Sequence, residues 1–467
     1  MGTTRSILTL AVATSLAASS PALAAAGLST ARTISGTGSA EQPQVAVGAA
    51  GRTLAVWNRQ GGRFDLPKGQ IDARLGQTGG SWGATQTLST SGSGPLAAVG
   101  SDSVAAVAWA TLGAKRSNTI YVSIARAGHS FGRAVRVTSG VGVGGPTGLE
   151  VQPDGRVVVV WVRGIPTPAA QPYRENVDFG LIAPGAQTLH TGLAGIAGRG
   201  SPTAALTADG TVLVASPTVL QLPGSGAPDG NQQGQVVTLS PGAQVFTSLP
   251  EIFAVPGDAN AEADGLAAVA GPGGAGVAFS AEGIQPNLLE LAPMLPSGFF
   301  GPPVAAASID ISSGLVGYAG PVLALPGDGA QIAAFELEQL DSPTDEAVVS
   351  AQIMAAVRPS GAAAFAAPTR LSGPPGVPSA PVSASAGGST VVLWGQSTGC
   401  HQQVYASVRP AGGAFGPARA VAGAFTTQQL LCGHANNTQL GVSGAGSHTI
   451  AGWLQGSKLD VATLSAQ

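Results

Sequence analysis

Charged residues are scarce in this chain of 467 amino acids: Asp, Glu, Lys and Arg make up 10% of it, and the net charge is −3. Because the net charge is small and negative, the protein has no bulk attraction to phosphate backbones, and we expect no nucleic-acid partner. Lysine occurs only at Lys68, Lys115 and Lys458, whereas Ala, Gly and Arg are abundant. This bias is typical of a high-GC bacterial genome.

Long apolar runs are also lacking, which argues against a membrane-inserted protein. The one apolar stretch near the N-terminus, Ile7 to Ala18, is too short to span a bilayer. With Arg5 before it and Ala22-Leu23-Ala24 after it, it predicts a secretory signal over residues 1–24. No Cys follows the cleavage site, so a lipid anchor is not expected. We expect residues 25–467 to be one secreted, extracellular, monomeric domain.

No common catalytic motif is present: the chain lacks a nucleophile elbow, a zinc-protease helix and a P-loop. What it has instead is a repeat. The clearest copy is QPDGRVVVVW (152–161), a turn followed by an apolar strand that ends in Trp. Seven more copies end at residues 57, 109, 216, 279, 335, 394 and 453. A period near fifty residues with strand-turn-strand chemistry indicates a repeat array.

The repeat predicts the inner strand of a propeller blade. Asp154-Gly155 is a hairpin turn, because Gly accepts positive φ and Asp tolerates it. Val157 to Val160 are apolar without alternation, as expected for a strand buried on both faces. The closing aromatic is expected to wedge between blades. We therefore predict an all-β fold: a single β-propeller of eight four-stranded blades, or seven if 200–320 holds one fewer.

The N-terminal strand is expected to close the ring. Thr33-Ile34-Ser35-Gly36 resembles the fourth strands of later repeats, such as Thr87 to Thr90, whereas the last repeat stops after a third strand, Leu459 to Leu464. Closure removes the free sheet edges that invite aggregation. The first strand of each repeat is expected to follow a proline, such as Pro43, Pro95 or Pro146.

A short turn precedes each fourth strand, as in GGSWGA (79–84), GHSFGR (128–133), SGFFGP (297–302) and GGAFGP (412–417). It resembles the Asp-box hairpin of secreted bacterial sialidase-type (BNR) propellers. The boxes are degenerate, because the expected Asp is replaced by Gln77, Arg126 and Pro410. The resemblance implies the fold more than any activity.

In propellers of this class, the loops from second to third strand and from blade to blade share one face, which usually holds the site. Here these loops are long and chemically varied, and they carry most of the charge. Candidate ligand-binding residues are Arg59, Arg163 and Arg174. Candidate catalytic residues are Tyr173, Glu175 and Glu338, since sialidases use arginines and a Tyr–Glu pair, and glycosidases use two carboxylates.

Only two cysteines occur, Cys400 and Cys432, in loops expected to reach the same face. Export favours a disulfide between them. The alternative is a zinc site that also uses His401 and His434, although adjacent Cys-His spacing suits chelation poorly.

Residues 256–265, PGDANAEADG, place Asp258, Asn260, Glu262 and Asp264 at alternate positions. Hard oxygen ligands in this order before a Gly are how short calcium loops bind their ion. The register is not that of an EF-hand, so the alternative is a solvated polar turn. No other cofactor is expected.

Charge is segregated along the chain. Between Gly200 and Val357 there are fifteen acidic residues and no Lys or Arg, whereas residues 1–199 hold sixteen Lys and Arg against eight acids. A closed ring would turn this into an acidic arc facing a basic one, which would orient a charged partner. The alternative is drift in solvated loops.

The sequence favours a non-catalytic recognition propeller that binds a glycan or another cell-surface macromolecule, because the scaffold is regular, the loops are variable and no catalytic motif is intact. The alternatives are a sialidase-like glycoside hydrolase and a structural envelope protein without a ligand.

Overall fold

The fold of the chain is known from a computed structural model. It describes residues 29–36, 38–60, 69–113, 117–165, 174–185, 187–197, 201–219, 232–249, 262–282, 287–309, 316–340, 348–372, 377–398, 400–421, 425–426 and 439–465. Regular structure in these residues is β-strand throughout, and none of them is helical. No helix in this part of the chain could cross a membrane. The predicted all-β class is confirmed.

The strands form seven hydrogen-bonded sheets, of which the first has seven strands. Its strands are β2 (Ser39–Val47), β3 (Arg52–Gln60), β4 (Gly69–Gln77), β5 (Gln86–Val99), β6 (Ala105–Leu112), β7 (Ser117–Ala125) and β8 (Val135–Val141). Strand β5 is long enough to serve twice. Its first half, Gln86 to Gly92, pairs with β4, and its second half, Ser93 to Val99, pairs with β6.

The next four sheets have four strands each. They contain, in order, β9 (Val143–Val151), β10 (Val157–Ile165), β11 (Arg174–Ile182) and β12 (Thr188–Ala197); β13 (Thr203–Leu206), β14 (Val212–Val219), β15 (Gln232–Leu239) and β16 (Thr247–Ser248); β17 (Glu262–Gly271), β18 (Gly274–Glu282), β19 (Asn287–Pro293) and β20 (Val304–Ile309); β21 (Val316–Ala324), β22 (Gln331–Leu340), β23 (Val348–Arg358) and β24 (Thr369–Arg370).

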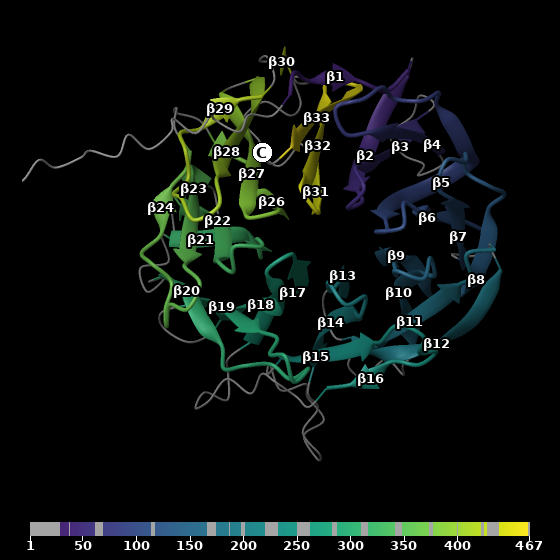
Figure 1. The fold of residues 1–467 in the computed structure, drawn as a ribbon, viewed down its shortest axis with the longest axis horizontal. Helices are drawn as coiled ribbons and strands as arrows, with labels where there is room; N and C mark the ends of the chain where they lie inside the picture. Colours follow the sequence, from purple (N-terminus) through teal and green to yellow (C-terminus); the bar gives the residue numbers. More distant parts are fainter. Residues whose placement is uncertain are drawn as a thin grey trace, which may run out of the picture.

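Two sheets complete the set. A six-stranded sheet contains β25 (Val377–Pro378), β26 (Val382–Ala386), β27 (Ser389–Thr398), β28 (His401–Arg409), β29 (Arg419–Ala420) and β30 (Phe425–Thr426). The last contains β31 (Leu440–Ala445), β32 (His448–Gln455), β33 (Lys458–Ser465) and, from the other end of the chain, β1 (Arg32–Thr33). Figure 1 shows the sheets standing side by side around a central opening, the arrangement of a β-propeller.

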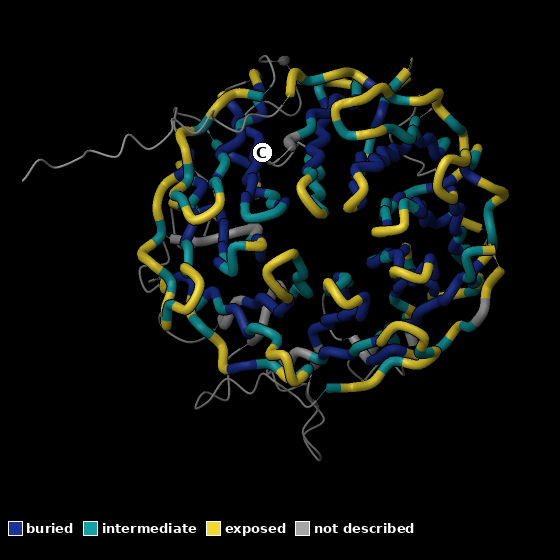
Figure 2. Tube along the Cα trace, in the orientation of Figure 1, coloured by how far each residue is buried: buried dark blue, intermediate teal, exposed yellow. Residues whose placement is uncertain are grey.

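The sequence repeat forms the second strand of each group, counted from the centre: β3, β6, β10, β14, β18, β22, β27 and β32. These strands are buried on both faces, whereas exposed residues gather at the turns (Figure 2). The closing aromatic packs into the preceding sheet, as predicted. Trp57 of β3 joins Ile450 and Leu454 of β32 in one cluster, and Trp161 of β10 joins Val122 of β7 in another.

Four first strands begin before their prolines Pro43, Pro95, Pro146 and Pro321, which corrects the sequence prediction, whereas β13 begins at Thr203, directly after Pro202, as predicted. Strand β2 contains Pro43, and its register with β3 shifts between Glu41 and Gln44. Such a bulge accommodates a residue that has no backbone N–H to donate. In β5 the residue before the proline is Gly94, with φ of 58°. In β2 it is Gln42, with φ of 48°, a left-handed conformation uncommon for a residue with a side chain.

Strand β1 takes the position of a fourth strand beside β33. Arg32 pairs with Val461 and Thr33 with Asp460. Ile34, which follows β1, is 2% exposed and lies in the core cluster of Trp57. The resemblance of residues 33–36 to later fourth strands therefore corresponds to an equivalent position in a sheet.

Candidate functional site

We call the end of each sheet at which the second strand leads to the third the loop end, as from Arg59 to Gln70 between β3 and β4. The opposite end, where the first strand turns into the second, is the turn end. Several loop-end connections lie outside the described residues, among them 61–68, 166–173, 220–231 and 341–347. The geometry of the candidate site is therefore that of the strand ends beneath those connections.

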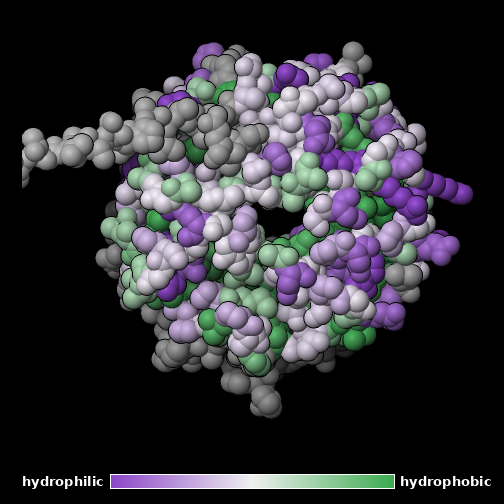
Figure 3. All heavy atoms as spheres, viewed as in Figure 1, coloured by the Kyte–Doolittle hydropathy of each residue, from purple (hydrophilic) through white to green (hydrophobic). Residues whose placement is uncertain are grey.

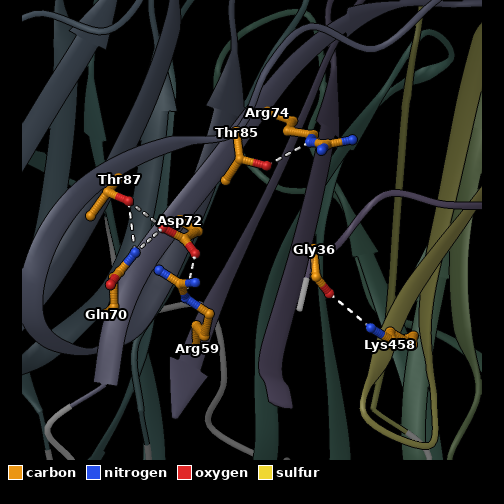
Figure 4. A network of polar contacts seen from close by, with 8 residues as sticks. All are labelled: Gly36, Arg59, Gln70, Asp72, Arg74, Thr85, Thr87 and Lys458. Carbon is orange, nitrogen blue, oxygen red and sulfur yellow. Dashed lines mark hydrogen bonds and ion pairs between the residues drawn. The ribbon is translucent and has the colours of Figure 1, made fainter. Parts of the chain in front are cut away.

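Arg59 is fixed at the loop end of β3 by a buried carboxylate. Its Nε lies 3.0 Å from Asp72 Oδ2, with 37% of the Arg59 side chain exposed against 2% for Asp72. The other carboxylate oxygen of Asp72 accepts hydrogen bonds from Thr87 Oγ1 at 2.8 Å and Gln70 Nε2 at 2.7 Å (Figure 4). A carboxylate held by three donors leaves its arginine with a defined orientation.

Arg163 repeats this arrangement in β10. Its guanidinium pairs with Asp178 of β11, and 48% of its side chain is exposed against 3% for Asp178. The register is the same in both sheets, because Trp57 is opposite Asp72 and Trp161 is opposite Asp178. In each case the arginine follows its Trp by two residues. Two preorganised guanidinium groups thus face solvent at the loop end of two sheets.

The third-strand position opposite the aromatic distinguishes the repeats. In β33 the residue at this position is Asp460, which lies opposite Trp453. Asp460 Oδ1 accepts a hydrogen bond of 2.5 Å from Thr33 of β1. In β7 and β28 it is a tyrosine: Tyr121 stacks on Trp109 with ring centroids 5.9 Å apart, and Tyr405 stacks on Trp394 at 6.1 Å. In these five repeats the position holds either an aspartate or a stacked tyrosine, and in the other three it holds Gln235, Glu290 and Met354.

Sequence reasoning missed these aspartates. A local signal was available, since each lies between two apolar residues of a third strand: Ile71-Asp72-Ala73, Val177-Asp178-Phe179 and Leu459-Asp460-Val461. A single charge in a buried strand requires a partner.

Gln42 is a second polar residue that sequence reasoning missed. Its backbone N–H donates to Gln439 Oε1 at 2.5 Å, and its side-chain Oε1 accepts from the Gly94 N–H at 2.9 Å. It therefore links the first strands of three successive groups, close to the axis. The space-filling view in Figure 3 is hollowed along that axis, and most of its strongly hydrophilic residues lie on the side of β4–β11.

The predicted residue Glu338 lies near the loop end of β22, two residues after Glu336, so both side chains point to one face of the sheet. Burial raises the pKa of Glu336 to about 7, with a contribution from the charge of Glu338. Burial also raises the pKa of Glu338. The stretch from 200 to 357, which contains both, has no Lys or Arg to stabilise their charged forms.

The structure does not gather the other sequence candidates into one site. Arg174 and Glu175 lie at the start of β11, not in a loop, because the β10–β11 hairpin stays paired from Val157 to Ile165. Glu175 is opposite Gly164, next to Arg163. Tyr173 lies outside the described residues. Arg59 and Glu338 belong to other sheets, so the candidates that share a hairpin are Arg163, Arg174 and Glu175.

The calcium prediction falls largely outside the described residues, which include neither Asp258 nor Asn260. Glu262 and Asp264 belong to β17, opposite Glu282 and Ser280. Within the described part of the chain, no three His, Cys, Asp or Glu residues form a metal-binding group. The calcium site stays a prediction.

Cys400 lies in the turn between β27 and β28, and His401 is the first residue of β28. Cys432 and His434 lie outside the described residues. The disulfide and its zinc alternative therefore stay predictions.

Comparisons with known proteins give fold-level similarity. No protein-family model and no curated protein matches the chain. Among solved structures, it is similar to the β-propeller domain of the Trilobed protease from Pyrococcus furiosus, with 10% identity, a TM-score of 0.43, and coverage of 82% of this chain and 98% of that one. It is also similar to an α-L-arabinanase from Penicillium chrysogenum, with 13% identity, a TM-score of 0.41, and coverage of 68% and 92%. A Dyadobacter fermentans protein of unknown function matches with 9% identity, a TM-score of 0.43, and coverage of 94% and 99%.

Proposed function

We propose that the protein is a secreted recognition propeller that binds a glycan at its loop end. The observation that carries this proposal is the pair of guanidinium groups, Arg59 and Arg163, each held half-exposed by a buried aspartate. An arginine fixed in this way offers several N–H donors in a planar fork, which suits sugar hydroxyl groups and carboxylates. Its orientation is set before a ligand arrives, so little entropy is lost on binding.

We propose eight four-stranded blades for the scaffold. The division of β5 into two paired halves supports counting the seven-stranded sheet as two blades. The pairing of β1 with β33 supports closure of the ring by the N-terminal strand. A closed ring would hold the loop ends of neighbouring blades in a fixed relation, which a multi-point glycan site requires.

A sialidase-like glycoside hydrolase is the second candidate. It is favoured by the carboxyl pair Glu336 and Glu338, because glycosidases need one carboxylic acid that keeps its proton near neutral pH. Burial weighs against it, since Glu336 is 3% exposed and a buried acid does not reach a substrate. A binder therefore accounts better for the accessible groups. An envelope protein without a ligand would leave both arginines unused.

Three further expectations belong to the proposal. Residues 1–24 direct export, the mature domain of 25–467 acts outside the cell as a monomer, and Cys400 is oxidised with Cys432 there. Calcium, if bound, would use the oxygens of Asp258, Asn260, Glu262 and Asp264.

Binding and turnover are separated by one experiment on purified residues 25–467. Sialosides and bacterial cell-wall polysaccharides are titrated, and bound fraction and released sugar are recorded in the same samples. Saturable binding without release supports the recognition function, and R59A and R163A should then weaken binding at least tenfold. Arg74→Ala is the matched control, since Arg74 bonds Thr85 on the same sheet away from the loop end (Figure 4).

Sugar release would instead support the hydrolase, and E338Q or E175Q should then abolish release while leaving binding measurable. Binding that is unchanged in R59A and R163A would overturn the loop-end site.

A further inference from the structure

A small cavity lies at the turn end of the molecule, where the N-terminal strand meets the sheet that follows it. It has a volume of about 220 Å³. Residues from three separate segments line it: the chain entering β1, the end of β33, and the turn after β4. Its chemistry is mixed, with the Trp82 indole, the Arg32 guanidinium, the Gln77 amide and the hydroxyl groups of Ser29, Thr30 and Thr463.

The corresponding place one repeat further along the chain is filled. There the turn residue Phe131 is 5% exposed, its N–H donates to Gln86 Oε1 at 2.9 Å, and Gln86 Nε2 donates to Phe131 O at 2.7 Å. Gln86 precedes Thr87, which is opposite Asp72. Arg32 precedes Thr33, which is opposite Asp460 in the same way. Arg32 thus stands where Gln86 stands, and Trp82 stands where Phe131 stands.

We call the contact between a fourth strand and the turn of the following repeat a seam. The seam with Gln86 and Phe131 is filled, whereas the seam with Arg32 and Trp82 contains the cavity. Arg32 Nη1 donates to Gly80 O at 3.2 Å, and Arg32 forms no ion pair with another described residue. Its Nη2 and Nε form no hydrogen bond to another described residue, and Arg32 lines the cavity. Trp82 is half-buried where Phe131 is buried.

The indole ring of Trp82 is held in place from behind. Trp82 forms an isolated β-bridge with Gly76. A Cβ added to Gly76 would lie 3.0 Å from Trp82 Cδ2 and Cε3, so the ring rests directly on the glycine backbone. A ring seated in this way presents a fixed apolar surface, as a sugar-binding platform must.

We propose that this seam cavity binds one carboxylate-bearing pyranose, such as a hexuronate residue at the end of a polysaccharide. An indole ring packs against the C–H face of a pyranose, the hydroxyl groups and the Gln77 amide match its hydroxyls, and the guanidinium matches its carboxylate. The volume is below the roughly 300–1,000 Å³ of drug-sized sites, which suits a single ring. The cavity lies at the end opposite Arg59, so it is a separate site and does not depend on glycan binding at the loop end.

Intrinsic fluorescence reports on this cavity selectively. The chain has six tryptophans, and five of them, Trp57, Trp109, Trp161, Trp394 and Trp453, are fully buried. Trp82 is the remaining one, so iodide in solution should quench its emission first. Titration of the full mature chain with methyl β-D-glucuronide should change this emission saturably and protect it from iodide. Methyl β-D-glucoside, which lacks the carboxylate, should bind at least about tenfold more weakly.

Variants assign the signal. W82F should lose the fluorescence change, and R32A should raise the dissociation constant for the glucuronide at least tenfold while unfolding at the wild-type temperature. Arg136→Ala is the matched control, because Arg136 lies opposite Tyr121 at the position that Thr33 occupies opposite Asp460, away from the cavity. It should bind as wild type does.

Three results would overturn the proposal: no saturable change with the glucuronide, a signal that persists in W82F, or equal affinity for the glucuronide and the glucoside. The loop-end proposal is tested separately by R59A, so failure of one site leaves the other measurable.

Discussion

Asp72 shows how one residue links the core to the surface. It is buried opposite Trp57, yet it holds Arg59 at the solvent boundary and accepts hydrogen bonds from Thr87 and Gln70. A buried carboxylate without partners would be costly, so the three donors are what make an Asp tolerable at this position. The tyrosines at the equivalent positions of β7 and β28 carry no charge and stack on the tryptophan instead.

The first prediction concerns this carboxylate. D72N keeps the size of the side chain but removes its charge and leaves an amide N–H₂ facing donors, so we expect the free energy of unfolding to fall by about 1–3 kcal/mol. Urea denaturation followed by fluorescence measures this. The matched control is D154N, because Asp154 pairs with Arg156 but 44% of its side chain is exposed, and its loss should cost less than about 1 kcal/mol. Equal effects of the two substitutions would contradict the role assigned to Asp72.

The second prediction concerns the pH dependence of stability at Glu336. Its pKa in the folded protein is raised to about 7 from an ordinary 4.5, so the folded state binds more protons than the unfolded state between these values. Stability at this site is therefore highest below pH 4.5 and falls as the pH rises to about 7, by about 3 kcal/mol. Thermal unfolding between pH 4.5 and 8 should show this fall for wild type and a smaller fall for E336Q, in which the other carboxyls with raised pKa, such as Glu150, still titrate.

E338Q is the companion variant, since it removes the neighbouring charge but keeps Glu336 buried. It should show a smaller fall than wild type. Superimposable pH profiles of wild type and E336Q would refute the prediction.

At the scale of the element, the repeat was predictable because the information is local. A Gly turn, an apolar run and a closing aromatic fall within ten residues, and these became β3, β6, β10 and their equivalents. The strand ends were not predictable in this way. Arg163 and Glu175 read as loop residues because they are charged, but they extend the β10–β11 hairpin. Their place depends on Asp178, which is distant in sequence from Arg163 and adjacent to it only after pairing.

The candidate site was predictable to a similar degree. The sequence alone was enough to choose arginines near the ends of the second strands as candidates. It did not reveal the buried aspartates that orient these arginines. The cavity beside Trp82 left no sequence signal at all, because it results from a difference between two seams. Phe131 and Trp82 occupy the same motif position, and the segments opposite them decide which seam is open.

The third prediction concerns the connection after β28. A disulfide between Cys400 and Cys432 would close a loop of about thirty residues and stabilise the protein by about 3 kcal/mol in the chain-entropy model. Thiol titration of the unfolded, non-reduced protein should find no free thiol, and two after reduction. C400S/C432S should unfold at a lower temperature than wild type. Two free thiols in the exported protein would rule out the disulfide. If that protein also contained zinc, and C400S/C432S did not, the alternative zinc site would be favoured.

At the scale of the whole molecule, the two ends of the chain meet in one sheet. Strand β1 covers β33, Ile34 enters the core cluster of Trp57, and Lys458 Nζ donates to Gly36 O at 2.9 Å (Figure 4). The same seam carries Arg59 at its loop end and the cavity at its turn end. The proposed closure of the ring and the proposed cavity site therefore both depend on a few residues around Arg32.

The fourth prediction follows from this arrangement. A mature protein that lacks residues 25–36 exposes the edge of β33 and opens the core around Trp57, because Ile34 no longer covers it. An uncovered strand edge pairs readily with another chain. We expect a lower unfolding temperature together with dimers or larger species in light scattering. T33V is the control, because it keeps the strand and loses the hydrogen bond to Asp460. It should remain monomeric with a modest loss of stability. A truncated protein that is monomeric and as stable as wild type would show that the N-terminal strand does not close the ring.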